Sequence, residues 1–378
     1  MDFKLTPHEE AYKQKLLEWL KKNLPKEFGT PQWKLPETWA GKAKWHRLWQ
    51  RKLFEAGYTA ITWPVKYGGQ DGTEMQHFIA TEILGKLNVV DNVNSPGFGQ
   101  AGPTIYACGT EEQKHCFLPR LFNGEHIWCQ GFSEPNAGSD LAALNTRAVR
   151  DGDDYVINGQ KIWTSKAHVA DYCLLVARTN AQAPKHKGLS YFIVPMTSPG
   201  ITVRPLRQIT GDPEFNEVFF DDVRVPRENM LGEENQGWQI AITTLMYERS
   251  GVSWYAPIRR TVDDLFEMAK KTCCRGTIAS KDPLIRQRLA QFYIGVEIMK
   301  YNGYRSLARQ LRGEVPGPEG SIGKLYWSQL NQRIQEVAME IQGPYHQLIQ
   351  GSDYAIDDGK WQFSFLRSRA DTIERGTS

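Results

Sequence analysis

The sequence predicts an α+β multidomain protein in which a helical domain, an antiparallel β-domain and a second helical domain follow one another. Apolar residues recur at three- and four-residue spacing in the first third of the chain, the period of a helix packed on one face. Short runs rich in β-branched and aromatic residues follow from about His126, and the helical period returns after Gly232. The 378 residues suffice for two or three domains, and we expect boundaries at residues 1–124, 125–234 and 235–378.

Two amphipathic helices are predicted in the first domain, over residues 6–24 and 39–55, and a further helix begins after Thr110. Thr110 and Gln113 have the spacing of a capping box, in which each side chain bonds the backbone N–H of the other residue. Stretches dense in glycine and proline, residues 63–69 and 95–103, interrupt the helical pattern. We expect them to be loops, which break the helices and can line a cleft.

Four strands are predicted in the middle domain from their β-branched and aromatic residues, at positions 154–157, 172–177, 189–194 and 217–220. Turn signals separate them, at Asp151-Gly152-Asp153, Asn158-Gly159, Ser198-Pro199-Gly200 and Gly211-Asp212-Pro213. No long helical pattern lies between the strands. They should therefore pair antiparallel and form a barrel or a sandwich rather than a doubly wound sheet.

Three apolar stripes with helical spacing predict the helices of the last domain. They consist of Ile258, Val262, Leu265, Phe266 and Ala269, then Ile285, Leu289, Phe292, Val296 and Met299, then Ile322, Leu325, Ile334, Val337 and Ile341.

Charge and composition exclude several classes of protein. The 46 Lys and Arg residues nearly balance 43 Asp and Glu, and the signs are mixed, so no extended basic field for nucleic acid is expected. No apolar run approaches the ~18 residues of a membrane span, and the start of the chain lacks the pattern of a secretory signal. We expect a cytoplasmic enzyme that binds neither nucleic acid nor membrane. The scattered cysteines favour reduced thiols over disulfides or a metal site; they are Cys108, Cys116, Cys129, Cys173, Cys273 and Cys274.

Two segments carry the candidate chemistry. Residues 130–140 read Gln-Gly-Phe-Ser-Glu-Pro-Asn-Ala-Gly-Ser-Asp, where small residues let the backbone approach a flat or anionic ligand and Ser133 and Ser139 offer hydroxyl groups. Residues 161–165, Lys-Ile-Trp-Thr-Ser, follow the Asn158-Gly159 turn and put an indole and two hydroxyls on a strand. Taken singly, the first segment is usually an ordinary turn, and a strand tryptophan such as Trp163 is usually core.

Together the two segments resemble the flavin site of the acyl-CoA dehydrogenase family, with its patterns TEPxAGSD and NGxKxWxT/S. The resemblance covers nearly the whole chain, including residues 109–119, 220–226 and 232–238. It implies an N-terminal helical domain, a middle antiparallel β-barrel domain and a C-terminal four-helix bundle. Relatives continue with one more helix beyond the position of Ser378.

The resemblance also implies the cofactor FAD. The loop from Gln130 to Ser133 should contact the isoalloxazine ring, Trp163 should pack on it, and Ser165 should lie near its N5 edge. Ser139 should meet the pantetheine or phosphate part of CoA. The cofactor-binding residues implied in this way are Gln130, Phe132, Ser133, Gly138, Ser139, Trp163, Thr164, Ser165 and Thr377.

The catalytic base follows from where the family carries its glutamate. Removing an α-proton from a thioester needs a carboxylate in a dry pocket, where desolvation raises its pKa. Relatives place it before a Gly-Thr near the C-terminus or in a Glu-Arg pair on the first helix after the β-domain. Arg375 takes the first position here, so Glu248 is the predicted base, with Tyr247 and Arg249 as substrate contacts. Relatives of this kind commonly act on branched, long or bulky acyl groups.

Two departures concern the family's grip on the diphosphate of a neighbouring subunit's FAD. The RxxFG segment is replaced by residues 271–276, Lys-Thr-Cys-Cys-Arg-Gly, and QxxGGxG by residues 340–346, Glu-Ile-Gln-Gly-Pro-Tyr-His. A glutamate facing a diphosphate repels it, and Pro344 removes a backbone donor. Either the site has drifted and still works, or a different chain supplies the clamp, as in heterotetrameric relatives that act on steroid side chains or dicarboxylic acids.

The resemblance therefore predicts an acyl-CoA dehydrogenase that forms a 2,3-enoyl-CoA and passes electrons to an electron-transferring flavoprotein. The expected assembly is a tetramer, possibly a heterotetramer with a related subunit. Two alternatives remain: an acyl-CoA oxidase, and a catalytically silent partner subunit that only completes an oligomer.

Overall fold

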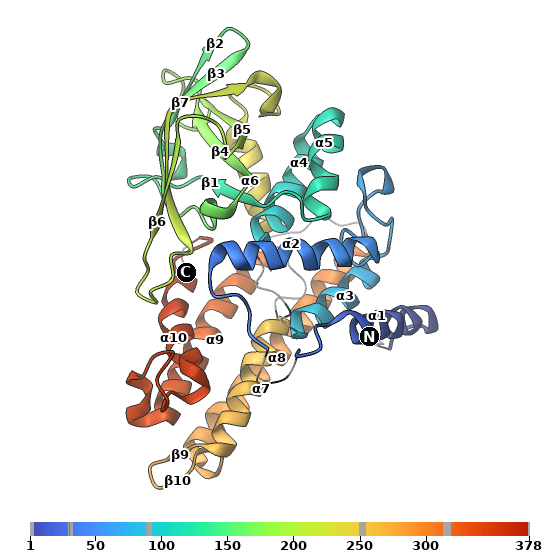
Figure 1. Cartoon of the computed structure of the whole chain (residues 1–378), viewed down its shortest axis with the longest axis vertical. Coiled ribbons are helices and arrows are strands. Elements are labelled where there is room, and N and C mark those ends of the chain that lie inside the picture. Colours follow the sequence, from blue (N-terminus) through green and yellow to red (C-terminus); the bar gives the residue numbers. More distant parts are fainter. Residues whose placement is uncertain are drawn as a thin grey trace. The chain divides into compact units, whose positions relative to one another are not determined.

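Helices α1 (Pro7–Asn23) and α2 (Trp39–Glu55) begin where the sequence predicts, because a threonine caps each of them. The Thr6 side chain accepts from the N–H of Glu9, and Thr38 accepts from Gly41. The structure is a computed structural model that describes residues 4–28, 30, 33–87, 89, 93–248, 255–312 and 319–376 (Figure 1).

The chain divides into two units. The first comprises Met1–Ala80, Asn88–Gln208 and Asp212–Glu248, and the second comprises Thr81–Leu87, Ile209–Gly211 and Arg249–Ser378. None of the helices in the described ranges combines the length and the apolar character needed to cross a membrane.

The predicted loop over residues 95–103 is wrong, because this stretch is helical. A π-helical turn, η2 (Gly97–Ala101), runs directly into α4 (Gly102–Cys108). Both prolines are compatible with it: Pro96 has helical dihedrals, φ −64° and ψ −31°, and Pro103 stands in the first turn of α4, where its missing N–H is tolerated. The capping box of Thr110 and Gln113 is confirmed at the start of α5 (Glu111–Phe122). Helix α3 (Glu74–Leu87) precedes them in the chain.

The described part of the first unit contains one eight-stranded sheet in the order β6-β7-β3-β2-β4-β5-β8, with β1 added on β4. Most neighbours pair antiparallel, as predicted, but β1 runs parallel to β4 and β2 meets β4 in parallel at Arg147 and Arg178. The strands are β1 (Trp128–Gly131), β2 (Arg147–Asp151), β3 (Asp154–Lys161), β4 (Tyr172–Arg178), β5 (Leu189–Pro195), β6 (Ile201–Leu206), β7 (Phe215–Pro226) and β8 (Met230–Leu231).

Asn158 and Gly159 do not form the predicted turn but a bulge inside β3. The pairing of β3 with β7 shifts register between Ile157 and Gly159. Gly159 has φ +151°, and a Cβ there would lie 2.5 Å from Thr146 Oγ1, so only glycine fits. The bulge lets β3 continue to Lys161 before the chain leaves the sheet.

Both faces of the sheet bury apolar side chains. One core includes Trp128, Leu174 and Tyr191 together with residues of α4, α5 and α6 (Gly237–Glu248). The other includes Tyr155, Phe192 and the free cysteines Cys129 of β1 and Cys173 of β4, which lie opposite each other in the sheet. Figure 1 shows α6 alongside β4 and β5, which it contacts. The last helix of the first unit thus packs on β4, the strand that pairs with β1 and so with Gln130 and Gly131.

The second unit contains the helices α7 (Tyr255–Lys271), α8 (Pro283–Gln310), α9 (Glu319–Gln342) and α10 (Lys360–Asp371), with a short hairpin of β9 (Cys273–Cys274) and β10 (Thr277–Ile278). The α8 stripe is buried as predicted, and so is that of α7 apart from the half-buried Phe266.

The third predicted stripe is buried only in its second half. Ile322 is 62% exposed and Leu325 is also exposed, while Lys324 and Ser328 face inward. The reason is a polar contact with the end of the chain, since Lys324 Nζ donates to the Gly376 carbonyl.

Candidate active site

Residues 130–140 leave strand β1 as a loop with one buried and one exposed end. Phe132 is buried, and its ring stands edge-on to Tyr191 with 5.8 Å between centroids. Glu134 and Ala137 exchange two backbone hydrogen bonds of 3.0 Å, which close a tight turn. Gly138 and Ser139 follow this turn and are exposed. Gln130 and Ser133 are half-buried.

Trp163 lies just after strand β3 and not on a strand, which corrects the sequence prediction. Its backbone has φ +59°, in the left-handed region that bulky residues rarely adopt. The indole is 58% exposed and contacts the ring of Phe215 edge-on, with 5.8 Å between centroids. Such a strained residue persists only where its surroundings hold it, and it points to a functional position.

The structure brings the two predicted segments together. The N–H of Ile162 donates to the carbonyl of Ser133 at 2.9 Å, so the residue before Trp163 is bonded to the first loop. On the other side, the N–H of Thr164 donates to the Asn216 carbonyl at 3.0 Å. These two bonds hold the backbone on either side of Trp163.

Two buried polar atoms of this region have no hydrogen-bond partner within the described part of the chain. They are Oγ1 of Thr164, a fully buried residue, and Nε2 of Gln130. Buried polar groups are nearly always hydrogen-bonded, so such atoms call for a ligand or water. An exposed indole with orphaned polar atoms on the two segments beside it fits a flat cofactor with polar ring edges, as FAD has. Ser165 is half-buried next to Thr164.

A buried ion pair that the sequence analysis missed lies beneath these segments. Lys161 Nζ is 2.8 Å from Glu134 Oε1, and both side chains are buried. Burial raises the pKa of Glu134, but Lys161 and the bonds from Thr146 and Asn145 outweigh it, so this pKa lies below its ordinary value. Burial lowers the pKa of Lys161, and Glu134 opposes this shift only in part. The sequence could have indicated this pair through Lys161, a charged residue that falls on the inward-facing side of strand β3.

The predicted base lies at the end of α6. Glu248 is the final residue of this helix; its side chain lies outside the described residues, as do Arg249 and Thr377. Tyr247 is half-buried, and burial, followed by Cys108 and Tyr106, raises its pKa.

One turn before Glu248, a buried hydroxyl group anchors α6. Thr244 Oγ1 is 2.9 Å from Thr104 Oγ1 and 3.1 Å from the hydroxyl of Tyr191. Helices α4 and α6 and strand β5 therefore meet at one point, which fixes the backbone that carries the predicted base.

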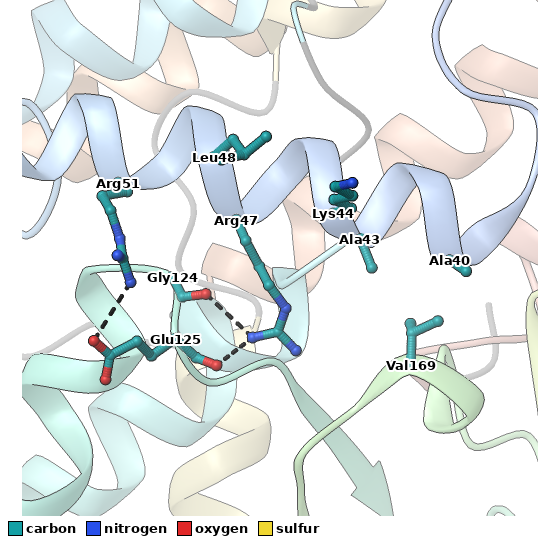
Figure 2. A pocket seen from close by; sticks show the side chains of 9 residues that line it. All are labelled: Ala40, Ala43, Lys44, Arg47, Leu48, Arg51, Gly124, Glu125 and Val169. Carbon is teal, nitrogen blue, oxygen red and sulfur yellow. Dashed lines mark hydrogen bonds and ion pairs between the residues drawn. The ribbon is translucent and has the colours of Figure 1, made fainter.

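A hollow of about 610 Å³ lies elsewhere in the first unit, lined by α2, the turn after α5 and the turn before β4. Figure 2 shows the side chains that line it. Arg47 bonds the carbonyls of Gly124 and Glu125 and also Asp171, and Arg51 pairs with the Glu125 carboxylate. The charged side chains that line the hollow thus bind α2 to the neighbouring turns. None of its lining residues is a predicted site residue; they are Ala40, Ala43, Lys44, Arg47, Leu48, Arg51, Gly124, Glu125 and Val169.

Glu340, predicted to disturb the diphosphate clamp, is held by two arginines of the same unit. Arg275 Nη2 lies 2.8 Å from its Oε1, and Arg288 pairs with its other oxygen. The cluster carries one net positive charge rather than a bare negative one. Pro344 lies in a short 3₁₀ helix, η7 (Gly343–Gln347), directly after α9.

Family models match three successive parts of the chain. They are Acyl-CoA dehydrogenase, N-terminal domain, over residues 6–125, the middle domain over residues 129–223 and the C-terminal domain over residues 235–378. The chain belongs to the acyl-CoA dehydrogenase family of FAD-dependent flavoproteins, and the predicted family, fold class, enzyme class and cofactor are confirmed.

Similar proteins are found in mycobacteria. The acyl-CoA dehydrogenase IpdE1 of Mycolicibacterium smegmatis is 40% identical over 345 residues, which cover 88% of this chain and 84% of the relative. The ChsE4-ChsE5 complex from Mycobacterium tuberculosis matches with a TM-score of 0.83 and 32% identity, over 100% of this chain and 95% of that one. The Tcur3481-Tcur3483 steroid ACAD matches with a TM-score of 0.82 and 28% identity, with the same coverage.

Proposed function

We propose that the chain oxidises an acyl-CoA thioester to the trans-2-enoyl-CoA, with Glu248 as the base that removes the α-proton. The observation that carries the proposal is the exposed, left-handed Trp163, bonded through Ile162 to Ser133 and flanked by the unpartnered atoms of Thr164 and Gln130. When bound, FAD supplies the hydride acceptor at its N5 atom.

The residues have separate roles in this proposal. Trp163 packs on the flavin ring, while Gln130, Thr164 and Ser165 offer polar groups to its edge. Ser139, exposed beyond the Glu134–Ala137 turn, is available to the CoA part of the substrate. Thr377 is assigned to the cofactor, and Tyr247 and Arg249 to the substrate, by family resemblance.

For the acyl group we propose a bulky substrate such as a steroid side-chain thioester. Support comes from the Glu-Arg position of the base and from the likeness to the Tcur3481-Tcur3483 steroid ACAD. Turnover of steroid side-chain and short straight-chain thioesters by the same preparation tests this choice.

The proposed electron acceptor is an electron-transferring flavoprotein in the cytoplasm. An acyl-CoA oxidase is the alternative within the enzymes, and oxygen consumption without an acceptor protein distinguishes the two. A silent partner subunit is the alternative outside them, and flavin reduction by substrate in the purified chain excludes it.

The variant Glu248→Gln tests the base. It should keep FAD and bind substrate but turn over about 100- to 10,000-fold more slowly, because an amide cannot accept the proton. The matched control is Glu233→Gln, an exposed residue before the same helix, which should retain wild-type activity. Bleaching of the flavin by acyl-CoA at the wild-type rate in Glu248→Gln rules out this residue as the base.

A further inference from the structure

The ion pair of Glu134 and Lys161 connects both candidate flavin segments. Glu134 Oε1 accepts from Lys161 Nζ at 2.8 Å and from the N–H of Thr146 at 2.8 Å, and Oε2 accepts from the N–H of Asn145 at 2.6 Å. Lys161 Nζ donates a second bond, of 3.0 Å, to the carbonyl of Phe132. The other hydrogen bonds of Glu134 and Lys161 thus go to Phe132, in the first loop, and to Asn145 and Thr146, shortly after it.

The lysine stem packs against the same loop. A Cβ built at Gly131 would lie 2.9 Å from Cys173 Sγ, which is too close, and 3.5 Å from Lys161 Cγ, so the lysine stem lies within van der Waals reach of this glycine. Lys161 also ends strand β3, two residues before Trp163. The Lys161 side chain therefore contacts the end of β1 and the Ser133 loop, and its backbone leads directly to Trp163.

The bond to Phe132 also sets the direction of one peptide group. In a trans peptide the C=O and the N–H point to opposite sides. With the Phe132 carbonyl turned toward Lys161, the N–H of Ser133 faces away from the ion pair. The charged pair costs desolvation that an apolar pair would not, so stability alone is a weak reason to have it.

We infer that Lys161 and Glu134 are positioning residues for the flavin, which fix the Phe132–Ser133 peptide so that the Ser133 N–H donates to the ring. This inference rests on the proposed function, because it needs the flavin on the Ser133 loop. It adds a buried ion pair that touches neither substrate nor cofactor and acts through the backbone.

The test compares the same substitution at two ion-paired lysines. Lys161→Met removes the buried charge, and Lys185→Met removes an exposed lysine that pairs with Asp140 of the same loop at 2.9 Å. In the full-length protein, with its partner chain where one is needed, Lys161→Met should weaken FAD binding at least tenfold and shift the flavin absorption band. Lys185→Met should change neither. Lys161→Arg, which keeps the charge, should restore part of the affinity.

The outcomes separate the two proposals. A wild-type protein that takes up no FAD contradicts the proposed function itself. If the wild type binds FAD and folded Lys161→Met has the same affinity and spectrum, only the positioning role is overturned. Should Lys161→Met fail to fold, the milder Glu134→Gln takes its place. Loss of fold in both, or normal flavin binding by a folded Glu134→Gln, assigns the pair to stability and overturns the inference.

Discussion

Trp163 has a strained backbone conformation, and its largely exposed indole ring contributes little apolar burial to stability. A left-handed conformation costs a bulky residue about 1–3 kcal/mol, and here the indole is mostly exposed. The bonds of Ile162 and Thr164 on either side therefore hold the conformation against this cost. A residue that the fold maintains in this way has a use outside the core.

We expect Trp163→Ala to weaken flavin retention and change the flavin spectrum. An aromatic face on the ring contributes roughly 0.5–1.5 kcal/mol beyond its buried area, or about 2- to 12-fold in affinity. Flavin release measured by fluorescence checks this, with Trp163→Phe as the matched control that keeps an aromatic face. Unchanged FAD content and absorption in Trp163→Ala would show that the ring has no contact with the cofactor.

The residues of the two motifs were predictable from the sequence, but the buried residues that hold them in place were not. Ser133 and Trp163 stand in patterns whose residue types suggest a ligand. Glu134 and Lys161 are separated by 27 positions. Their pairing depends on a bulge in β3 and on the parallel approach of β1 to β4, neither of which a single sequence specifies.

Helix α6 is held near its end by polar contacts as well as by apolar packing. Thr244 shares hydrogen bonds with Thr104 and Tyr191, all in the buried interior. Removing the shared hydroxyl leaves its two partners with fewer bonds in a place that water does not reach.

We therefore expect Thr244→Val to lower the free energy of unfolding by about 1–3 kcal/mol. The control is Thr243→Val, the preceding residue of the same helix, whose hydroxyl donates to the Gln239 carbonyl near the surface. Urea unfolding of both variants measures the difference. Equal stability of the two would contradict the anchoring role.

The junction of α9 and α10 contains a carboxyl group that should make stability depend on pH. Burial raises the pKa of Asp371 to about 6 from 3.8, although bonds from Asn331 and Arg367 lower it and Glu374 raises it. Between pH ~4 and ~6 the folded chain holds a proton that the unfolded chain has released. The free energy of unfolding should fall by about 3 kcal/mol as pH rises through this window, at 1.36 kcal/mol per pKa unit.

The variant Asp371→Asn checks the prediction, because the amide oxygen can still accept from Asn331 but carries no charge. Its stability should change less between pH 4 and 7 than that of the wild type, and it should be the more stable protein at pH 7. An exposed residue, Asp353, provides the control Asp353→Asn. A slope in Asp371→Asn equal to that of the wild type would assign the pH dependence to other groups.

Among the elements, those with strong periodicity were the predictable ones. Helices α1 and α2 and strands β4 and β5 lie within about a residue of their predicted ranges, because caps and β-branched runs are local signals. The π-helical turn before α4 was mistaken for a loop because its glycines and prolines are helix breakers in most contexts. Near the start of α9, Lys324 faces inward because the segment after α10 supplies its partner, the Gly376 carbonyl, which periodicity cannot reveal.

The second unit has surfaces suited to association. Exposed Ile294, Ile298 and Tyr301 lie at helical spacing on α8, and exposed Ile322 and Leu325 lie on α9. Apolar patches of this kind on a folded surface often mark interfaces. Glu340 meanwhile occupies Arg275 and Arg288, which leaves these arginines less free for a diphosphate.

We predict an α2β2 assembly with a related chain and less than one FAD per chain. The ChsE4-ChsE5 complex, a complex of two components, is similar to this chain over its whole length. Co-expression with a related dehydrogenase chain, followed by native mass measurement and flavin quantification, tests the prediction. A stable homotetramer with one FAD per chain and full activity would refute it.

The bonds that Asn145 and Thr146 make to Glu134 have a consequence for how the molecule opens. Both N–H groups bond a buried carboxylate instead of a neighbouring strand, and that of Thr146, itself buried, shares the oxygen Oε1 with Lys161. Hydrogen exchange at the Thr146 amide should therefore require the same large-scale opening as exchange in the centre of the sheet. We expect the backbone around Thr146 to belong to the slowly opening part of the chain, so that a ligand enters and leaves through the movement of other segments.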